Sequence, residues 1–199
     1  SAASDVYKRQ AVDFYKACKR QGVRPIIGCE VYVAPRTRYD RERVQDKAYN
    51  HLVLLCENEE GYKNLIAMVS KSYTEGFYFK PRIDRDLLQK HHQGLICLSA
   101  CLAGEIPQAL LERDYDKAKE TALWYSDLFS SEHYYLELQD HGIPEQQTVN
   151  AGLLRLSRET GIPLVATNDV HYVRREDAKI QQVLILSLIH ISEPTRPEP

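Results

Sequence analysis

The chain has 199 residues, of which 43% are hydrophobic and 27% charged, and its formal net charge is −2. This composition is typical of one soluble globular domain, and it provides no basic field that would hold nucleic acid over the whole surface. No apolar run is long enough to cross a membrane, residues 1–5 lack the apolar core of a signal peptide, and five cysteines without framework spacing favour a reducing compartment. The sequence therefore predicts a cytoplasmic protein without membrane contact.

The two ends of the chain differ from its middle. Residues 1–10 are polar and patternless, and residues 186–199 finish in Ser-Glu-Pro-Thr-Arg-Pro-Glu-Pro, which continues neither a helix nor a central strand. Both segments resemble translated adapter sequence. We expect them to be non-native tails around a partial domain of residues 11–185.

The first half of that domain alternates helix and strand. A helix is predicted over residues 11–21 and ends at Gly22, and strands are predicted over 25–33 and 51–56. Asn58 is placed to cap a further helix with an apolar stripe, made of Tyr62, Leu65, Ile66, Val69 and Tyr73.

The second half repeats the alternation. Strands are predicted over residues 95–101, 134–139 and from 162 to the segment around Asp169. One helix starts at Asp116 with an apolar face of Ala118, Ala122, Tyr125 and Phe129. Another starts at Pro144 and ends at Gly161, with an apolar face of Val149, Leu153 and Leu156.

Repeated strand–helix units predict an α/β fold with parallel strands and helices outside. The chain has no glycine-rich phosphate loop, so a barrel or part of one is favoured over a nucleotide-binding sheet, although five strands are too few to close it. Residues 34–50 show no helical periodicity. The strands on either side are therefore expected to form an antiparallel hairpin, which brings His51 near the strand that contains Glu30.

Several residues suited to metal binding or proton transfer lie at predicted strand ends. Asp169 and His171 are two apart on a predicted strand and would face the same side, and Glu30 is the only charged residue of its strand. With His51 and Cys101 they form a mixed set of oxygen, nitrogen and sulfur donors, which suits zinc or manganese better than magnesium.

Each of these positions also has a structural interpretation. His51 could be a capped core histidine and Cys101 a small buried hydrophobic residue, while Glu137 could be an acid of a barrel layer paired with an arginine. The aromatic run Phe77-Tyr78-Phe79, near Lys71, Lys80 and Arg82, could stack on single-stranded DNA. Rings of this kind more commonly pack a loop against a barrel, and we expect that role here.

Five segments together carry a resemblance to a known family. They are Ile-Ile-Gly-Cys-Glu-Val-Tyr at 26–32, His-Leu-Val-Leu-Leu at 51–55, Leu-Ser-Ala-Cys-Leu-Ala-Gly-Glu at 98–105, Leu-Glu-Leu-Gln-Asp-His-Gly at 136–142 and Ala-Thr-Asn-Asp-Val-His-Tyr at 166–172. In this order they resemble the PHP (polymerase and histidinol phosphatase) domain of bacterial replicative DNA polymerase III alpha subunits. The segment 75–84 favours that polymerase branch over free-standing phosphatases.

The resemblance implies a distorted (β/α)7 TIM-like barrel around a divalent metal cluster of zinc or manganese. Glu30, His51, Cys101, Asp169 and His171 fall on family ligand positions, and Asp169 and His171 are also expected to be catalytic. Glu137, Asp140 and His141 do not fall on family ligand positions, and we expect them to be structural. The family's first strands, which carry further ligands, have no counterpart here, so we expect an incomplete barrel and little or no hydrolysis by this chain alone.

The resemblance also implies a function. The parent would be a DNA-directed DNA polymerase with a magnesium site outside this chain, and the PHP site would perform 3′–5′ exonuclease hydrolysis. Its partners would be DNA and the other subunits of the replicative polymerase holoenzyme. Two alternatives remain: a non-catalytic PHP module that braces the polymerase, and a free-standing PHP phosphoesterase such as histidinol phosphatase.

Overall fold

The computed structural model describes residues 10–46, 48–172 and 174–184. They fall into two units, 10–168 and 169–184, and each is taken by itself. The expected tails, residues 1–10 and 186–199, lie outside the described residues except for Gln10, which begins the first helix.

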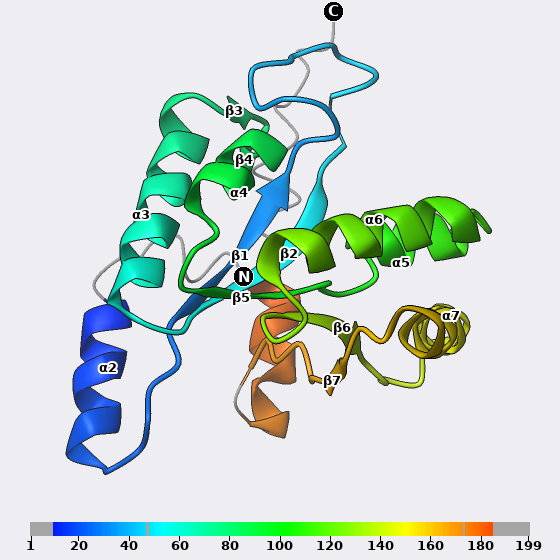
Figure 1. Cartoon of the computed structure of the whole chain (residues 1–199). Coiled ribbons are helices and arrows are strands. Elements are labelled where there is room, and N and C mark those ends of the chain that lie inside the picture. Colours follow the sequence, from blue (N-terminus) through cyan, green and yellow to red (C-terminus); the bar gives the residue numbers. More distant parts are fainter. Residues whose placement is uncertain (1–9, 47, 173, 185–199) are drawn as a thin grey trace, which may run out of the picture. The chain divides into compact units, whose positions relative to one another are not determined.

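The larger unit is built on one seven-stranded sheet with the order β3-β4-β1-β2-β5-β6-β7 (Figure 1). The strands are β1 (Gly28–Val33), β2 (Asn50–Cys56), β3 (Phe77–Tyr78), β4 (Lys80–Ile83), β5 (Leu95–Leu98), β6 (Tyr134–Leu138) and β7 (Leu164–Ala166). The sheet is open, with β3 and β7 at its two ends. This agrees with the expected α/β fold and with an incomplete barrel.

The strands are of mixed direction. The expected hairpin is confirmed, because β1 and β2 pair antiparallel with Tyr32 opposite His51. The expectation of otherwise parallel neighbours is wrong at β2, which also runs antiparallel to β5. The hairpin is the physical reason: it reverses β2 relative to β1, while β4, β5, β6 and β7 run in the direction of β1.

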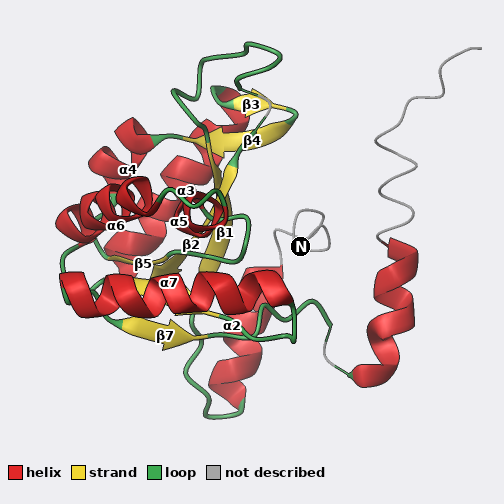
Figure 2. Cartoon of the chain, turned by 90° about the vertical axis from the view of Figure 1, so that its right-hand side faces the viewer, coloured by secondary structure: helices red, strands yellow, loops and turns green. Residues whose placement is uncertain are grey.

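Helices cover the sheet in two groups (Figure 2). α3 (Glu59–Thr74) packs on α4 (Arg85–His91) and over β1, β2 and β4, whereas α5 (Glu105–Leu111), α6 (Tyr115–Phe129) and α7 (Pro144–Thr160) pack on one another near β5 and β6. The first helix, α2, spans Gln10–Arg20. Alternate strand residues point under the helices, so the core contains Val31, Leu52, Leu54, Cys97, Tyr134 and Leu136.

The predicted helix faces are confirmed in α6 and α7 and partly wrong in α3. Asn58 caps α3 as expected, because its side chain accepts a hydrogen bond from the N–H of Gly61. However, α3 buries Gly61, Leu65, Met68 and Ser72, while Tyr62, Ile66 and Tyr73 of the expected stripe are exposed. A Cβ on Gly61 would lie 1.7 Å from the carbonyl oxygen of Gly94. This close approach sets which face of the helix is buried.

The long connection between β1 and β2 is held down by two buried arginines. Arg82 of β4 is fully buried, and its guanidinium donates to the backbone oxygens of Asp40 and Asp46, each at 2.8 Å. Arg38 of the connection pairs with Asp84 at 3.0 Å and with Glu75 at 2.8 Å. This segment therefore has a fixed path without forming a helix or strand.

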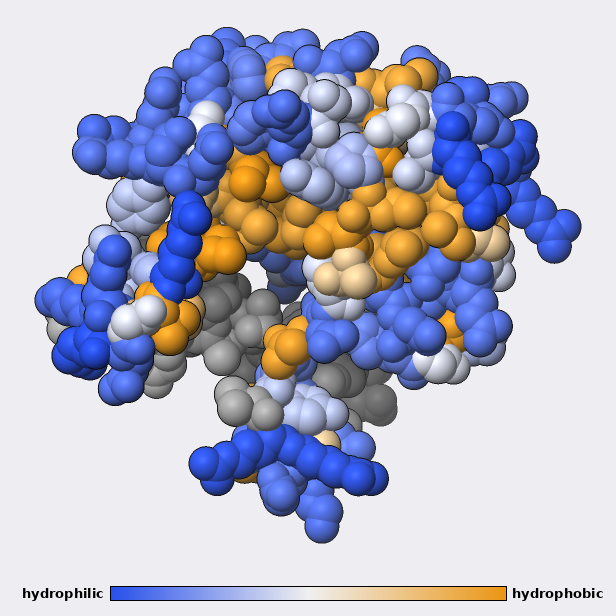
Figure 3. Space-filling view, turned by 60° about the horizontal axis from the view of Figure 1, so that its bottom comes forward, coloured by the Kyte–Doolittle hydropathy of each residue, from blue (hydrophilic) through white to orange (hydrophobic). Residues whose placement is uncertain are grey.

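The other side of the sheet is less covered. Val53, Leu55 and Ile96 alternate with core residues and are only half-buried. Figure 3 shows hydrophobic side chains gathered in a band on one side of the molecule. The half-covered strand face also carries the polar side chains of Glu30 and His51.

The smaller unit begins at Asp169 and includes the 3-10 turn η1 (Arg175–Asp177). Among the described residues, no helix combines the length and the apolar character needed to cross a membrane.

Candidate metal centre

Glu30 and His51 are brought together by the β1–β2 hairpin. Glu30 is opposite Val53 and His51 is opposite Tyr32, so the two side chains are diagonal neighbours on one face of the sheet. The Nδ1 atom of His51 lies 3.3 Å from Oε1 of Glu30, and both side chains are partly accessible to solvent. The hairpin predicted from the sequence is thus what creates this contact.

Cys101 reaches the same place from a loop. The strand expected to end at Cys101 ends at Leu98, so that placement of the cysteine was wrong by three residues. The loop turns at Ala100, whose φ is 65°, and it docks on β2 because the N–H of His51 donates to the oxygen of Ala103 at 3.0 Å. As a result, Sγ of Cys101 lies 3.6 Å from Nδ1 of His51.

Glycine is required where this loop meets β2. Gly104 bridges to His51, and a Cβ at this position would lie 2.2 Å from the backbone oxygen of Ser99. The φ angle of Gly104 is −69°, so the demand is for space and not for a left-handed backbone. A tight turn with Cys101 and Gly104 at its ends therefore fixes the thiol beside the imidazole.

The three side chains fit a metal. One ligand atom from each of Glu30, His51 and Cys101 lies within 4.8 Å of the others. Usual zinc bond lengths in a tetrahedral site place nitrogen and oxygen donors about 3.3 Å apart and nitrogen and sulfur donors about 3.6 Å apart. The two printed distances from Nδ1 of His51, 3.3 Å and 3.6 Å, match these values.

The electrostatics of the group favour a cation. Burial lowers the pKa of His51, but hydrogen bonds to Cys101 and Glu30, with the charges of those groups, outweigh it and raise the pKa to about 9. The imidazole is thus charged at neutral pH without a metal. Metal binding at that pH releases its proton, since a ligand histidine is neutral.

Asp169 and His171 are placed differently from the sequence expectation. They are not on a strand, because β7 ends at Ala166 and the backbone of Asp169 has a left-handed φ of 43°. Strand alternation therefore does not orient these two side chains, and the prediction that they face the same side of a strand is wrong. Nδ1 of His171 lies 2.7 Å from the backbone oxygen and 3.9 Å from the carboxylate of Asp169. Both belong to the smaller unit, and their role as ligands stays a prediction.

Glu137 takes the structural role, with different partners from those expected. It is 6% exposed, and its Oε1 accepts from Thr167 and, at 2.9 Å, from Gln139 rather than from an arginine. Its N–H donates to Ser99, two residues before Cys101. His141 lies 2.8 Å from the backbone oxygen of Asn168, the residue before Asp169. The contacts of Glu137 in β6, and of His141 in the loop after it, hold the loops that follow β5 and β7.

Two tyrosines beside His51 were missed by the sequence reasoning. The ring of Tyr32 lies 5.1 Å from the imidazole, and the ring of Tyr49 lies 6.0 Å away and nearly parallel to it. The register of the expected hairpin carries the signal for Tyr32, because a symmetric pairing of the two strands places it opposite His51.

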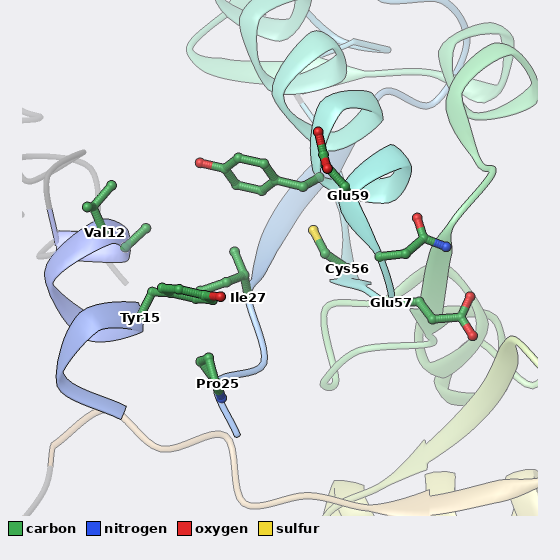
Figure 4. A pocket seen from close by; sticks show the side chains of 10 residues that line it. Val12, Tyr15, Pro25, Ile27, Cys56, Glu57 and Glu59 are labelled. Atoms are coloured by element: carbon green, nitrogen blue, oxygen red, sulfur yellow. The ribbon is translucent and has the colours of Figure 1, made fainter. Parts of the chain in front are cut away.

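A groove elsewhere in the larger unit has none of the three donors among its lining residues. Figure 4 shows it between α2, the segment before β1 and the start of α3. Its volume is about 520 Å³, and it is lined by Ala11, Val12, Tyr15, Pro25, Ile27, Cys56, Glu57, Asn58, Glu59 and Tyr62. The groove is therefore separate from the group formed by Glu30, His51 and Cys101.

Comparison with known proteins gives one family. The PHP domain family matches residues 4–141, which include Glu30, His51 and Cys101. The chain is 48% identical over 176 residues to the DNA polymerase III subunit alpha of Treponema pallidum (strain Nichols), covering 88% of this chain and 15% of the relative. The same subunit of Thermus aquaticus is 47% identical over 190 residues, covering 94% and 16%, and that of Helicobacter pylori is 40% identical over 183 residues, covering 87% and 15%. The chain thus spans about 15% of the length of these relatives.

Proposed function

This chain belongs to the PHP domain family, and from that premise we propose that Glu30, His51 and Cys101 hold a divalent metal in a site for phosphodiester hydrolysis. We further propose that the chain is part of a bacterial replicative DNA polymerase III alpha subunit, in which this site removes nucleotides from DNA 3′ ends. The polymerase activity, its magnesium site, DNA and the partner subunits of the holoenzyme belong to that parent protein.

One observation carries the proposal. The imidazole of His51 lies 3.3 Å from a carboxylate oxygen and 3.6 Å from a thiol sulfur, which is the spacing of donors around one tetrahedral ion. The donor set favours zinc, or manganese where further oxygen donors join. Asp169 and His171 are proposed as such additional ligands.

The proposed role of each residue follows from the charge of its side chain. When bound, the metal supplies Lewis-acid polarisation of the phosphodiester and activation of a water molecule. Glu30 and Cys101 supply the negative charge that retains a cation on a partly exposed face, and His51 contributes a neutral nitrogen after losing its proton. Asp169 and His171 are also proposed to be catalytic: Asp169 would orient the water through a carboxylate oxygen that does not bind the metal, and His171 would hold the metal in place. Since the chain carries only part of the family's ligand set, we expect weak or no hydrolysis by this chain alone.

The test uses the intact alpha subunit that contains these residues. Wild-type protein should retain metal after dialysis and should shorten a 3′-labelled single-stranded oligonucleotide. Asp169→Asn and Cys101→Ser should lose most of that exonuclease activity while nucleotide incorporation stays near the wild-type rate, because the polymerase site is separate. Cys56→Ser, in the same strand as His51, is the matched control and should behave as wild type.

A subunit without bound metal and without nuclease activity would rule the proposal out. It would favour a non-catalytic PHP module, in which the same contacts of 3.3 Å and 3.6 Å act as metal-free polar bonds that tie the loop of Cys101 to the hairpin. Hydrolysis of phosphate monoesters without action on DNA would instead indicate a phosphoesterase of the histidinol phosphatase kind.

A further inference from the structure

Aromatic rings continue from His51 along the strand face. Tyr32 and Tyr49 lie 4.8 Å apart between ring centroids, and each also contacts the imidazole ring. Both tyrosines are only half-buried. They form an aromatic surface directly beside one of the three proposed metal ligands.

These rings differ from the aromatic pair of the core. Tyr125 and Tyr134 stack at 5.5 Å under the helices and are 1% and 0% exposed. A pair whose purpose is packing is expected to be buried in this way, because burial of ring area is its source of stability. Tyr32 and Tyr49 are instead only half-buried, so part of each side chain is in contact with solvent beside the proposed metal ligands.

A cation lies at the outer end of the aromatic surface. Nζ of Lys80 is 5.8 Å from the ring centroid of Tyr32, and the residue is exposed. Its neighbour in β4, Arg82, is fully buried and donates to backbone oxygens, so it cannot reach a phosphate. Beyond Lys80, the rings of Tyr78 and Phe79 are 4.6 Å apart and Phe79 is 58% exposed.

We propose that Tyr32, Tyr49 and Lys80 form a subsite for single-stranded DNA next to the metal ligands. Unpaired bases stack on the tyrosine rings, and the Lys80 ammonium binds a backbone phosphate. Stacking on aromatic rings combined with a nearby cation is how proteins hold single strands without reading their sequence. The use of this subsite to feed a 3′ end to the metal rests on the proposed function, but DNA binding itself requires no metal.

The binding test uses the full 199-residue chain, a fluorescein-labelled ten-nucleotide oligothymidylate and fluorescence anisotropy in the presence of a chelator. Tyr49→Leu and Tyr32→Leu should each weaken binding by about fivefold or more, the loss expected for one stacked base. Tyr49→Phe keeps the ring and should bind within about twofold of wild type. Tyr62→Leu removes an exposed tyrosine from the outer helix α3 and is the matched control.

Salt dependence tests the lysine separately. For a single strand each phosphate contact contributes about −0.7 to the slope of log affinity against log salt concentration. Lys80→Gln should reduce the magnitude of that slope by about this amount, whereas Lys63→Gln on α3 should leave it unchanged. Since Tyr49 lies before β2 and outside the sheet, its variant should keep the wild-type melting temperature even if Tyr32→Leu disturbs β1.

The outcomes separate this inference from the proposed function. Tyrosine-dependent binding in a protein that never takes up metal would support the subsite and reject the metal site. A chain that does not bind the oligonucleotide, that binds it equally well after Tyr49→Leu, or that binds a duplex as tightly as the single strand would overturn the subsite. None of those results depends on whether metal is bound.

Discussion

The position of the Cys101 loop depends on the absence of a side chain at Gly104. A Cβ added there meets the oxygen of Ser99 at 2.2 Å, a distance that requires the backbone to move. We predict that Gly104→Ala lowers the free energy of unfolding by about 2–3 kcal/mol, the usual cost of overpacking. It should also weaken metal binding, because the same loop positions Cys101. Chemical denaturation and metal titration of the variant measure the two effects.

Gly142 offers a matched control for that substitution. It has a left-handed φ of 73° and open space around its Cα, so Gly142→Ala should cost about 1 kcal/mol and leave metal affinity unchanged. Equal metal affinity in the Gly104 and Gly142 variants would contradict the proposed role of the loop.

At the residue scale, the proposed metal ligands could be named from the sequence more readily than the residues that surround them. Glu30 could be singled out because a charged side chain in an apolar strand is costly unless it is paired or bound, whereas His51 and Cys101 were singled out by their places at predicted strand ends and by the family resemblance. Tyr49 could not be singled out, since its place beside His51 follows from the path of residues 34–49, which is fixed by contacts with Arg82 and not by any local pattern. Asp169 was misplaced because its left-handed backbone breaks the strand alternation on which the inference depended.

Among the elements, β4 fixes the connection between β1 and β2 through Arg82. The guanidinium of Arg82 donates hydrogen bonds to the backbone oxygens of Arg38, Asp40, Asp46 and Gly76. Arg82→Met would remove the guanidinium donor from the backbone oxygens of Arg38, Asp40 and Asp46, while the Gly76 oxygen keeps the N–H of residue 82, so we predict a loss of about 3 kcal/mol or more in the free energy of unfolding. Arg43→Met, exposed in the same connection, should change stability by less than about 0.5 kcal/mol. Similar urea midpoints for the two variants would contradict this role.

Glu75, directly after α3, contacts the connection between β1 and β2, and this contact makes stability depend on pH. Hydrogen bonds from Arg38, Lys71 and Tyr39 hold the pKa of Glu75 at about 2, below its ordinary value of 4.5. Because the folded-state pKa is depressed, this contribution is fully present above pH 4.5 and is lost as the pH falls toward 2. We predict that Glu75→Gln makes stability fall less steeply between those values. Urea unfolding at a series of pH values tests this, and an unchanged slope would refute it.

Helices and strands were predicted correctly where an apolar pattern extends over several turns, and incorrectly where the element is short or where tertiary contacts decide which face is buried. The faces of α6 and α7 follow directly from spacing. The two-residue β3 and the four-residue β4 were missed because they are too short to show alternation, and β4 contains a proline. The buried face of α3 is set by the approach of Gly61 to Gly94, which no helical period encodes.

At the scale of the whole molecule, the larger unit keeps apolar surface in contact with water. Val12 and Phe14 of α2 are exposed, and the sheet is open at both ends. Exposed apolar surface and unpaired strand edges favour self-association. We predict concentration-dependent association of this chain in sedimentation velocity experiments, reduced by Phe14→Glu and not by Leu154→Glu, which changes a single exposed leucine of α7. A strictly monomeric chain at high concentration would contradict the prediction.

That the sheet is open could be predicted from the number of strands, but the antiparallel direction of β2 relative to β5 could not. Antiparallel pairing of β2 with β5 depends on the return path through α3, β3, β4 and α4, and that path is fixed only when the core forms. The contact between Glu30 and His51 does not depend on that pairing, because the β1–β2 hairpin alone makes it. Cys101 reaches His51 through the loop that follows β5, so its position does depend on the pairing of β2 with β5.

The most direct test of the account is a cobalt titration of the full chain. One equivalent of Co²⁺ should produce a thiolate-to-cobalt charge-transfer band in the near ultraviolet, since Cys101 is placed beside His51 and Glu30. The band should disappear in Cys101→Ser and persist in Cys56→Ser. Absence of the band in the wild-type chain, or a band that survives Cys101→Ser, would contradict the assignment of Glu30, His51 and Cys101 as a metal site.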